Sequence, residues 1–192
     1  MSELIKQFFF NPRTIGAMCP STALLGKEIT TNAGIENSSV IVEVGAGTGA
    51  FTKHIIEKVP ENSHFFAVEI NEQVCKILKE RFPDEKIYNC CISQLPEILK
   101  EHDLEMVDTF ISGLPWAVFP DKLQDDLLKI IYDNLRPGGM FVTFAYLQGM
   151  VLPSAHKFRK KLDRTFHEVE KGKVVWGNIP PAFVYRCRKK EQ

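Results

Sequence analysis

The sequence has 192 residues, of which 44% are hydrophobic and 25% charged, with 24 basic and 24 acidic side chains. This length and composition are typical of one globular domain, and we expect a single domain over residues 1–192. The sequence has no run of about 18 uncharged apolar residues and no signal-peptide pattern at its N-terminus, which argues against a membrane-spanning or secreted protein. We therefore expect a cytoplasmic protein.

The first predicted elements are helices. Residues 1–36 are expected to form a helical segment that caps a ligand site. Its first helix is short and amphipathic, with one apolar face made of Leu4, Ile5, Phe8 and Phe9. A second helix is predicted to start at Ser21, which can cap it, and to end near Thr30.

Short apolar segments then alternate with longer amphipathic ones. Strands are predicted at 40–44, 65–69, 86–90, 107–112 and 140–146, and helices between them at 50–58, 72–81, 95–101 and 122–135. At the end of the chain, 174–176 and 182–187 are predicted to pair as an antiparallel hairpin at the sheet edge. Such alternation indicates an α/β fold over 37–192, with a parallel sheet, helices on both faces and ligands at the carboxyl ends of the strands.

The most specific pattern follows the first predicted strand and opens a helix. It is the series Gly45, Ala46, Gly47, Thr48, Gly49. Glycines here allow a tight turn and a close approach of a ligand, but the spacing is not that of dinucleotide-binding loops. Glu43, just before the series, suits a cationic amino group, directly or through water, and Glu69 ends the second strand, where a carboxylate can accept both ribose hydroxyls. Together these features favour a nucleoside with an amino-acid tail.

This three-part pattern resembles the class I S-adenosylmethionine-dependent methyltransferase superfamily over residues 40–146. The resemblance implies a Rossmann-like, seven-stranded, mostly parallel sheet whose last strand is antiparallel, with S-adenosyl-L-methionine as cofactor. It implies further cofactor-binding residues at the ends of the second, third and fourth strands, namely Ile70, Cys91, Ile92, Ser112 and Leu114. Superfamily members usually have an Asp where Cys91 stands, so a backbone group or Ser93 is expected to bind the adenine amino group instead.

The fourth predicted strand ends at the segment 112–116, where class I enzymes place groups that face the methyl acceptor. Adenine-N6 methyltransferases, including the ribosomal RNA dimethylases, carry Asn or Asp at the position that Gly113 occupies here. Glycine has no side chain to accept a hydrogen bond from an adenine amino group. This difference argues against adenine as substrate and against nucleic acid as partner.

Three segments, at residues 10–22, 112–115 and 176–185, resemble the bacterial-type phospholipid N-methyltransferase family, which methylates phosphatidylethanolamine. The resemblance implies methyl transfer to the amine of such a phospholipid, and no catalytic base is evident. We take Tyr146, Tyr185 and Asn178 as candidate catalytic residues, although core or edge packing explains the tyrosines equally well.

The charge distribution is compatible with a lipid substrate. Residues 31–149 contain 10 Lys and Arg against 18 Asp and Glu, whereas residues 150–192 contain 11 against 4. A basic end can meet an anionic membrane surface, or it can be a solvated tail. The candidate contacts to substrate and membrane are Phe8, Phe9, Arg13, Lys157, Arg159 and Lys160, which would place the protein peripherally at the inner face of the membrane.

Other readings stay open. One is a ribosomal RNA adenine-N6-type or small-molecule methyltransferase on the same core, and another is a non-catalytic module that binds cofactor or lipid. The five cysteines have no zinc-ligand spacing, so no metal is expected. The number of methyl groups added and the oligomeric state do not follow from the sequence.

Overall fold

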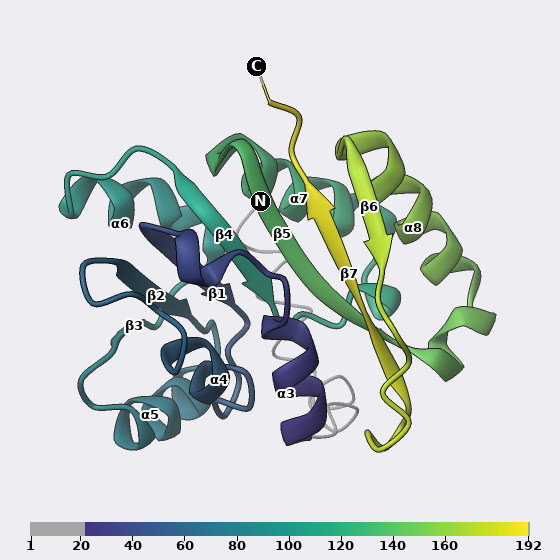
Figure 1. Cartoon of the computed structure of the whole chain (residues 1–192), viewed down its shortest axis with the longest axis horizontal. Coiled ribbons are helices and arrows are strands. Elements are labelled where there is room, and N and C mark those ends of the chain that lie inside the picture. The colour runs from purple at the N-terminus through teal and green to yellow at the C-terminus, as the bar shows by residue number, and fades with distance from the viewer. Residues whose placement is uncertain (1–21, 192) are drawn as a thin grey trace.

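The computed structural model of the chain describes residues 22–191 (Figure 1). The predicted first helix, with Phe8, Phe9 and Arg13, lies outside the described residues. The second predicted helix is α3 (Ala23–Thr30). Its cap is Thr22 and not Ser21, because the Thr22 side chain accepts a hydrogen bond from the backbone N–H of Leu25.

The described residues form one seven-stranded sheet, with strands in the order β3-β2-β1-β4-β5-β7-β6. Strands β1 to β5 are parallel, and β7 runs antiparallel between β5 and β6. This arrangement confirms the predicted Rossmann-like fold. The strands are β1 (Val40–Val44), β2 (His64–Val68), β3 (Lys86–Tyr88), β4 (Val107–Ser112), β5 (Leu135–Tyr146), β6 (Glu168–Lys171) and β7 (Ala182–Arg188).

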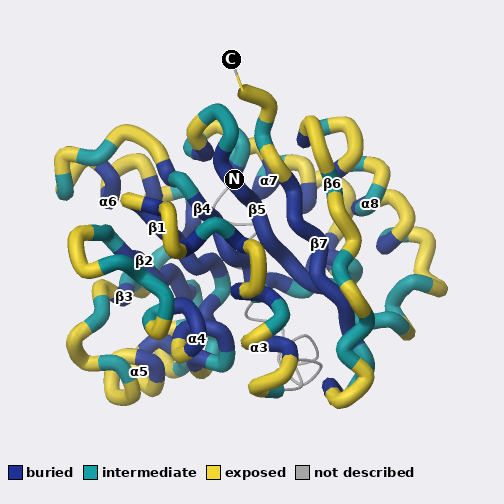
Figure 2. Tube along the Cα trace, in the orientation of Figure 1, coloured by how far each residue is buried: buried dark blue, intermediate teal, exposed yellow. Residues whose placement is uncertain are grey.

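Helices cover both faces of the sheet (Figure 1). One face packs against α3, α4 (Thr52–Ile56) and α5 (Glu72–Arg81), and the other against α6 (Leu95–Glu101), α7 (Asp121–Asn134) and α8 (Pro153–Thr165). The central strands are buried on both sides, while the outer faces of the helices are exposed (Figure 2). None of the helices in the described part of the chain is long and apolar enough to cross a membrane.

Short 3-10 helices join several of these elements. They are η1 (Ile35–Asn37), η2 (Ile92–Gln94), η3 (Trp116–Val118) and η4 (Leu147–Val151). The first, η1, lies between α3 and β1, while the others follow strands. Two of them, η3 after β4 and η4 after β5, lie at the carboxyl edge of the sheet, where they shape the second pocket described below.

The C-terminal hairpin differs from the prediction. Strand β7 pairs with β6 (Glu168–Lys171), whereas the predicted partner at 174–176 contributes a single bridge between Val175 and Ala182. The β6–β7 hairpin lies at the sheet edge as predicted, with β7 beside β5 and β6 outermost. Strand β6 was missed because it is a largely exposed edge strand of sequence Glu-Val-Glu-Lys, without the apolar residues that indicate a buried strand.

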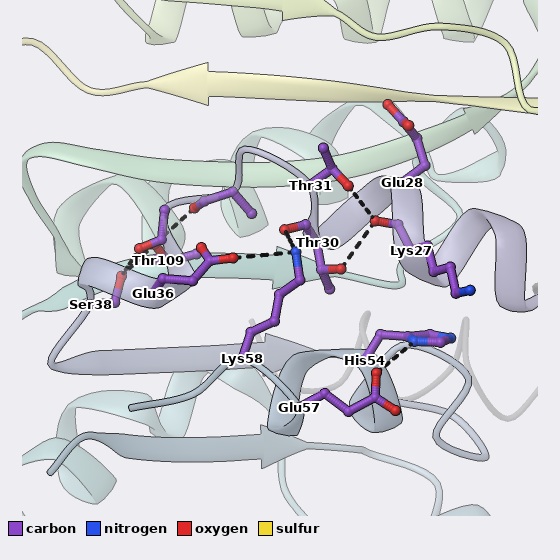
Figure 3. Close-up of polar contacts among 12 residues, drawn as sticks. Lys27, Glu28, Thr30, Thr31, Glu36, Ser38, His54, Glu57, Lys58 and Thr109 are labelled. Atoms are coloured by element: carbon purple, nitrogen blue, oxygen red, sulfur yellow. Dashed lines mark hydrogen bonds and ion pairs between the residues drawn. The ribbon is translucent and has the colours of Figure 1, made fainter. Parts of the chain in front are cut away.

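The segment that leads from α3 into β1 is tied to the core by polar contacts (Figure 3). The Lys58 ammonium donates to the Thr30 carbonyl oxygen at 2.8 Å, at the end of α3. The hydroxyls of Ser38 and Thr109 lie 2.9 Å apart, which joins the segment to β4. Residues 22–38 are therefore part of the packed domain, and the capping role expected for 1–36 stays a prediction.

Candidate functional site

The ends of four neighbouring strands meet at one edge of the sheet. Val44, the last residue of β1, pairs with Val68 at the end of β2 and with Ser112 at the end of β4. Val68 in turn pairs with Tyr88 at the end of β3. The connections that leave β1 and β4 diverge here, which is the point where ligands bind in open parallel sheets.

The glycine loop lies at this point with little space between it and the β4 end. Gly45 has a φ of +70°, and its N–H donates to the Val68 carbonyl oxygen at 2.9 Å. A Cβ atom on Gly113 would lie 2.4 Å from the Gly45 carbonyl oxygen, far closer than packing allows. Gly113 is therefore required by the close approach of the two loops, and an Asn or Asp there would displace the glycine loop.

Gly47 is different, because a Cβ atom there would meet no atom of residues 22–191 within 4 Å. Its φ of +58° favours glycine, and its N–H points at a carboxylate. Glu69 Oε2 accepts this N–H at 2.9 Å, and Glu69 Oε1 accepts the N–H of Asn71 at 2.8 Å. Burial raises the pKa of Glu69, and these backbone hydrogen bonds oppose the shift. Glu69 thus holds the loop in place, while the space above Gly47 is clear for a ligand.

Glu43 is fully buried beneath the loop. The Thr52 hydroxyl, at the start of α4, donates to Glu43 Oε2 at 2.6 Å. Oε1 has no hydrogen-bond partner within the described residues. Burial raises the pKa of Glu43 to about 8, although the bond from Thr52 opposes this. An unpaired carboxylate oxygen in this position is suited to a cationic ligand group.

A small pocket lies between these loops. Six predicted cofactor residues line it together with four others, so the structure brings the ends of β1 to β4 into one cavity. The predicted residues are Gly45, Glu69, Ile70, Cys91, Ile92 and Leu114, and the others are Val44, Val68, Cys90 and Leu127.

The remaining predicted cofactor residues support the pocket from outside. Those that belong to the loop or to the strand just before it do not line the cavity, namely Glu43, Ala46, Gly47, Thr48 and Gly49. Ser112 is buried below it, where its hydroxyl oxygen accepts hydrogen bonds from the Leu114 N–H and the Trp116 indole N–H, at 3.3 and 3.1 Å. Ser112 therefore fixes the segment after β4 instead of facing the pocket.

The wall after β3 carries thiols and no carboxylate. Cys91 is buried and Cys90 half-buried, and burial raises the pKa of the Cys90 thiol to about 11. The Cys90 thiol is therefore neutral at physiological pH.

A second, larger pocket of about 410 Å³ opens between η3 and η4. We call it the apolar groove. It is lined by Pro115, Trp116, Ala117, Val118, Phe144, Ala145, Tyr146, Gln148, Gly149, Val151 and Leu152.

Comparisons with known proteins agree with this geometry. Residues 41–139 match the family model described as a methyltransferase domain. The chain is 31% identical over 185 residues to an ornithine lipid N-methyltransferase from Singulisphaera acidiphila, covering 95% of this chain and 92% of that protein. The chain belongs to the class I S-adenosylmethionine-dependent methyltransferases. The predicted enzyme class is confirmed, and this relative is itself an N-methyltransferase.

Solved structures show the same fold. An O-methyltransferase from Bacillus cereus in complex with SAH superposes with a TM-score of 0.72 at 12% identity, covering 98% of this chain and 90% of that one. Human N-acetylserotonin methyltransferase in complex with SAM superposes with a TM-score of 0.63 at 17% identity, covering 86% and 51%.

A ribosomal RNA methyltransferase is a more distant relative. The probable ribosomal RNA small subunit methyltransferase A of Methanococcoides burtonii is 21% identical over 155 residues, and this chain spans 53% of its length.

The methyltransferase uses S-adenosylmethionine, and its pocket fits this group. The unpaired oxygen of Glu43 suits the cationic amino group, and the space above Gly47 leaves room for the ligand. The roles of individual residues in holding the cofactor are taken up as proposals below.

The candidate catalytic residues of the methyltransferase do not lie together. Tyr146 lines the apolar groove, where its ring packs edge-on against Phe144. Tyr185 is only 2% exposed and packs in the core, 5.0 Å from the Phe183 ring and 5.2 Å below the Arg159 guanidinium. Tyr185 lines neither pocket. We therefore assign it to the core and no longer to catalysis.

Asn178 is also structural. Its Oδ1 accepts hydrogen bonds from the backbone N–H and the hydroxyl of Thr22, at 2.9 and 2.8 Å, and its Nδ2 donates to the Pro180 carbonyl oxygen at 2.7 Å. It is buried and joins the 178–181 turn to the start of α3. These bonds use its polar atoms, so we withdraw the catalytic assignment.

Two of the three predicted membrane cations on α8 have partners inside the domain. Lys157 pairs with Asp121 at 3.1 Å, and Arg159 pairs with Asp163 at 2.8 Å. Lys160 is exposed, and its contact with a membrane stays a prediction.

Besides the lining residues Val44, Val68 and Cys90, sequence reasoning missed the roles of three residues of the site. Thr52 stands three positions after the last loop glycine, and a hydroxyl at the start of the next helix was a usable signal. The steric requirement at Gly113 could not be read without the neighbouring loop, and Leu127 reaches the pocket from α7, which only the tertiary fold reveals.

Proposed function

We propose that the protein transfers methyl groups from S-adenosylmethionine to the primary amine of a membrane lipid, of the phosphatidylethanolamine type, at the membrane surface. The observation that carries this proposal is the 31% identity, over nearly the whole of both chains, to an ornithine lipid N-methyltransferase. Ornithine lipids and phosphatidylethanolamine both present a primary amine next to acyl chains. The extent of the match makes a lipid amine the favoured acceptor.

Two structural observations support a lipid over an adenine acceptor. Gly113 offers no side-chain acceptor for an adenine amino group, and the contact with Gly45 excludes a larger residue. The cavity next to the cofactor pocket is apolar, as a lipid substrate requires.

In this proposal, the cofactor pocket holds the donor through the groups described above. Glu43 accepts the amino group, and Glu69 accepts the ribose hydroxyls while it keeps its bond to Gly47. Cys91 and Ile92 surround the adenine. S-adenosylmethionine supplies a methyl group on a positively charged sulfur, so transfer to a neutral amine moves positive charge without separating charges.

The protein's contribution is then to position the amine and exclude water. Titratable groups among the described residues that line the two pockets are Glu69, Cys90, Cys91 and Tyr146. We assign Tyr146 to orienting the amine, because it lies in the groove at the end of β5. An ethanolamine amine has a pKa of about 10, as lysine does, so the rate should rise with pH as the neutral amine becomes available.

Exposed apolar side chains support action at a membrane surface. Val151, Trp176 and Ile179 are 83%, 70% and 77% exposed. The segments that carry them lie at the carboxyl edge, because β7 starts with Ala182 paired to Tyr146 at the end of β5. An apolar rim next to a lipid site is suited to contact with a bilayer.

Transfer of radioactive methyl groups tests the proposal. Vesicles of phosphatidylethanolamine, vesicles that contain ornithine lipid, and ribosomal RNA serve as separate acceptors. We expect label in the lipid fraction and none in RNA. Label in RNA alone, or binding of cofactor with no transfer to any acceptor, would contradict the proposed function.

Vesicle co-sedimentation tests the membrane contact separately. Trp176→Ser should reduce binding to anionic vesicles severalfold, whereas Ile77→Ser, at an exposed apolar position on α5, serves as the matched control. Equal binding of both variants would contradict a contact between the apolar rim and the membrane.

A further inference from the structure

The apolar groove and the cofactor pocket are lined by consecutive residues of the segment that follows β4. Leu114 lines the cofactor pocket, and the next residue, Pro115, lines the groove. Trp116 and Ala117 of η3 extend one wall, and Gly149 of η4 belongs to the other. A molecule in the groove can therefore present one end to the methyl donor.

None of the described residues that line the groove has a charged side chain. Its polar side chains are Tyr146, Gln148 and the indole of Trp116, whose N–H is already bonded to Ser112. Val118 and Leu152 at the rim are 49% and 42% exposed. A polar ligand would leave most of its polar groups without hydrogen-bond partners in such a cavity, whereas a hydrocarbon chain has no hydrogen bonds to lose on entering it.

The floor of the groove is firmly packed. The Trp116 ring is 1% exposed and stacks on Phe158 at 4.8 Å. The Trp116 carbonyl oxygen accepts a hydrogen bond from Gln124 at 2.8 Å, in addition to the indole bond to Ser112. The cavity is therefore a built feature of the fold and not a gap left by loose packing.

We propose that the groove between η3 and η4 binds an acyl chain of the lipid substrate, so that the enzyme recognises its substrate by the chain as well as by the amine. The proposal deepens the proposed function and rests on it. The size of the groove, the lack of charge among its described lining residues and the adjacency of Leu114 and Pro115 all favour this occupant. A water-soluble amine with the same headgroup would lack this contact and should be a poor substrate.

Fluorescence tests the groove directly, because the chain has two tryptophans and one of them lies in it. The Trp176→Phe variant leaves Trp116 as the one tryptophan, which can be excited selectively. Single-chain ethanolamine lipids with a brominated chain, used below their micelle concentration, should quench Trp116, because bromine quenches indole on contact. Brominated lipid that leaves Trp116 unquenched would overturn the proposal, as would a groove filled by the first 21 residues of the chain itself.

Gly149→Leu fills the groove without disturbing the fold. A Cβ atom on Gly149 would lie 3.9 Å from the Ala117 Cβ on the opposite wall, an ordinary contact. Each methylene excluded from the groove should weaken lipid binding about fourfold, so we expect a loss of about tenfold or more. Glu61→Leu, at an exposed position before β2 and thus at the opposite edge of the sheet, is the control. Both variants should bind S-adenosylmethionine as the wild type does.

Chain length provides the final readout. With unbrominated single-chain lipids of increasing length, KM should fall about fourfold for each added methylene until the groove is filled. Gly149→Leu should end this trend at a shorter chain. KM values that do not depend on chain length would overturn the proposal. Methylation of lipid without quenching of Trp116 would reject the groove while the proposed function stands.

Discussion

The buried carboxyl of Glu43 gives the sharpest prediction, which concerns the substitution Glu43→Gln. Glutamine has nearly the same shape, and its amide oxygen can accept the hydrogen bond that Thr52 donates at 2.6 Å. It has no proton to lose, however, and no negative charge for a cationic ligand. The substitution therefore removes the ionisation and leaves the packing in place.

The magnitude follows from the pKa of Glu43, which burial raises from the ordinary 4.5 to about 8. Because the pKa of the folded state is the higher one, the stability contributed by protonated Glu43 is fully present below pH 4.5. It is lost as the pH rises towards about 8. Each pH unit above the ordinary pKa lowers the free energy of unfolding by roughly 1.4 kcal/mol, so the loss at pH 7 is about 3 kcal/mol.

The assay is urea unfolding of the wild type and Glu43→Gln without cofactor, from pH 5 to pH 8. We expect the variant to gain stability relative to the wild type as pH rises, by about 2 to 3 kcal/mol between pH 5 and pH 7. Any change in packing adds a constant offset and does not affect this slope. Glu61→Gln, at an exposed position, is the control.

Cofactor binding should change in the opposite direction. A charge-assisted hydrogen bond contributes about 1.5 to 3 kcal/mol, so Glu43→Gln should bind S-adenosylmethionine about 10- to 100-fold more weakly in calorimetry above pH 8, where Glu43 of the wild type is already ionised. A stability difference that stays constant from pH 5 to pH 7 would refute the reasoning about burial. Unchanged cofactor affinity would refute the role of the carboxylate in holding the amino group.

Further substitutions test other parts of the site and fold. Gly47→Val should abolish cofactor binding in calorimetry while costing only about 1 to 2 kcal/mol of stability, because its Cβ meets no atom of the described residues but its φ is +58°. Gly113→Ala should lower both the Tm and the cofactor affinity, because its Cβ would lie 2.4 Å from the Gly45 carbonyl oxygen; normal binding would contradict this packing. Asn178→Ala should cost about 2 to 4 kcal/mol in urea unfolding, since three buried hydrogen bonds are lost, while the catalytic rate at saturation is kept. Hydrogen bonds from Lys161 and Lys157 lower the pKa of Asp121 below its ordinary value of 3.8. The ionised group therefore stabilises the fold above pH 3.8, and this stabilisation is lost as the pH falls through the lowered pKa. In acid unfolding, Asp121→Asn should lack this part of the stability loss.

The sequence was most informative where burial and covalent spacing decide the structure. β1 and β4 were predicted to the residue, because a fully buried central strand reads as an uninterrupted apolar run. The glycine loop and Glu69 were found by their spacing, and the strand register then places them together because parallel strands end at one edge. β6 was missed because an exposed edge strand carries no such signal.

Side-chain roles were harder to predict than the fold. Tyr185 and Asn178 lie in a segment that resembles a family motif, but the resemblance does not separate residues that contact a substrate from residues that hold a turn. Burial and hydrogen bonding decide this, and both depend on partners distant in sequence, such as Thr22 for Asn178. The apolar groove was likewise not predictable, because its two walls, η3 and η4, come from different parts of the chain.

The central claim is that this methyltransferase acts on the amine of a membrane lipid. Mass spectrometry of lipids tests it most directly, after incubation of the protein with phosphatidylethanolamine vesicles and S-adenosylmethionine that carries a deuterated methyl group. The account predicts lipid whose headgroup nitrogen carries one or more deuterated methyl groups. Lipid that stays unmodified, with the cofactor bound and the same label transferred to RNA or a small molecule, would contradict it.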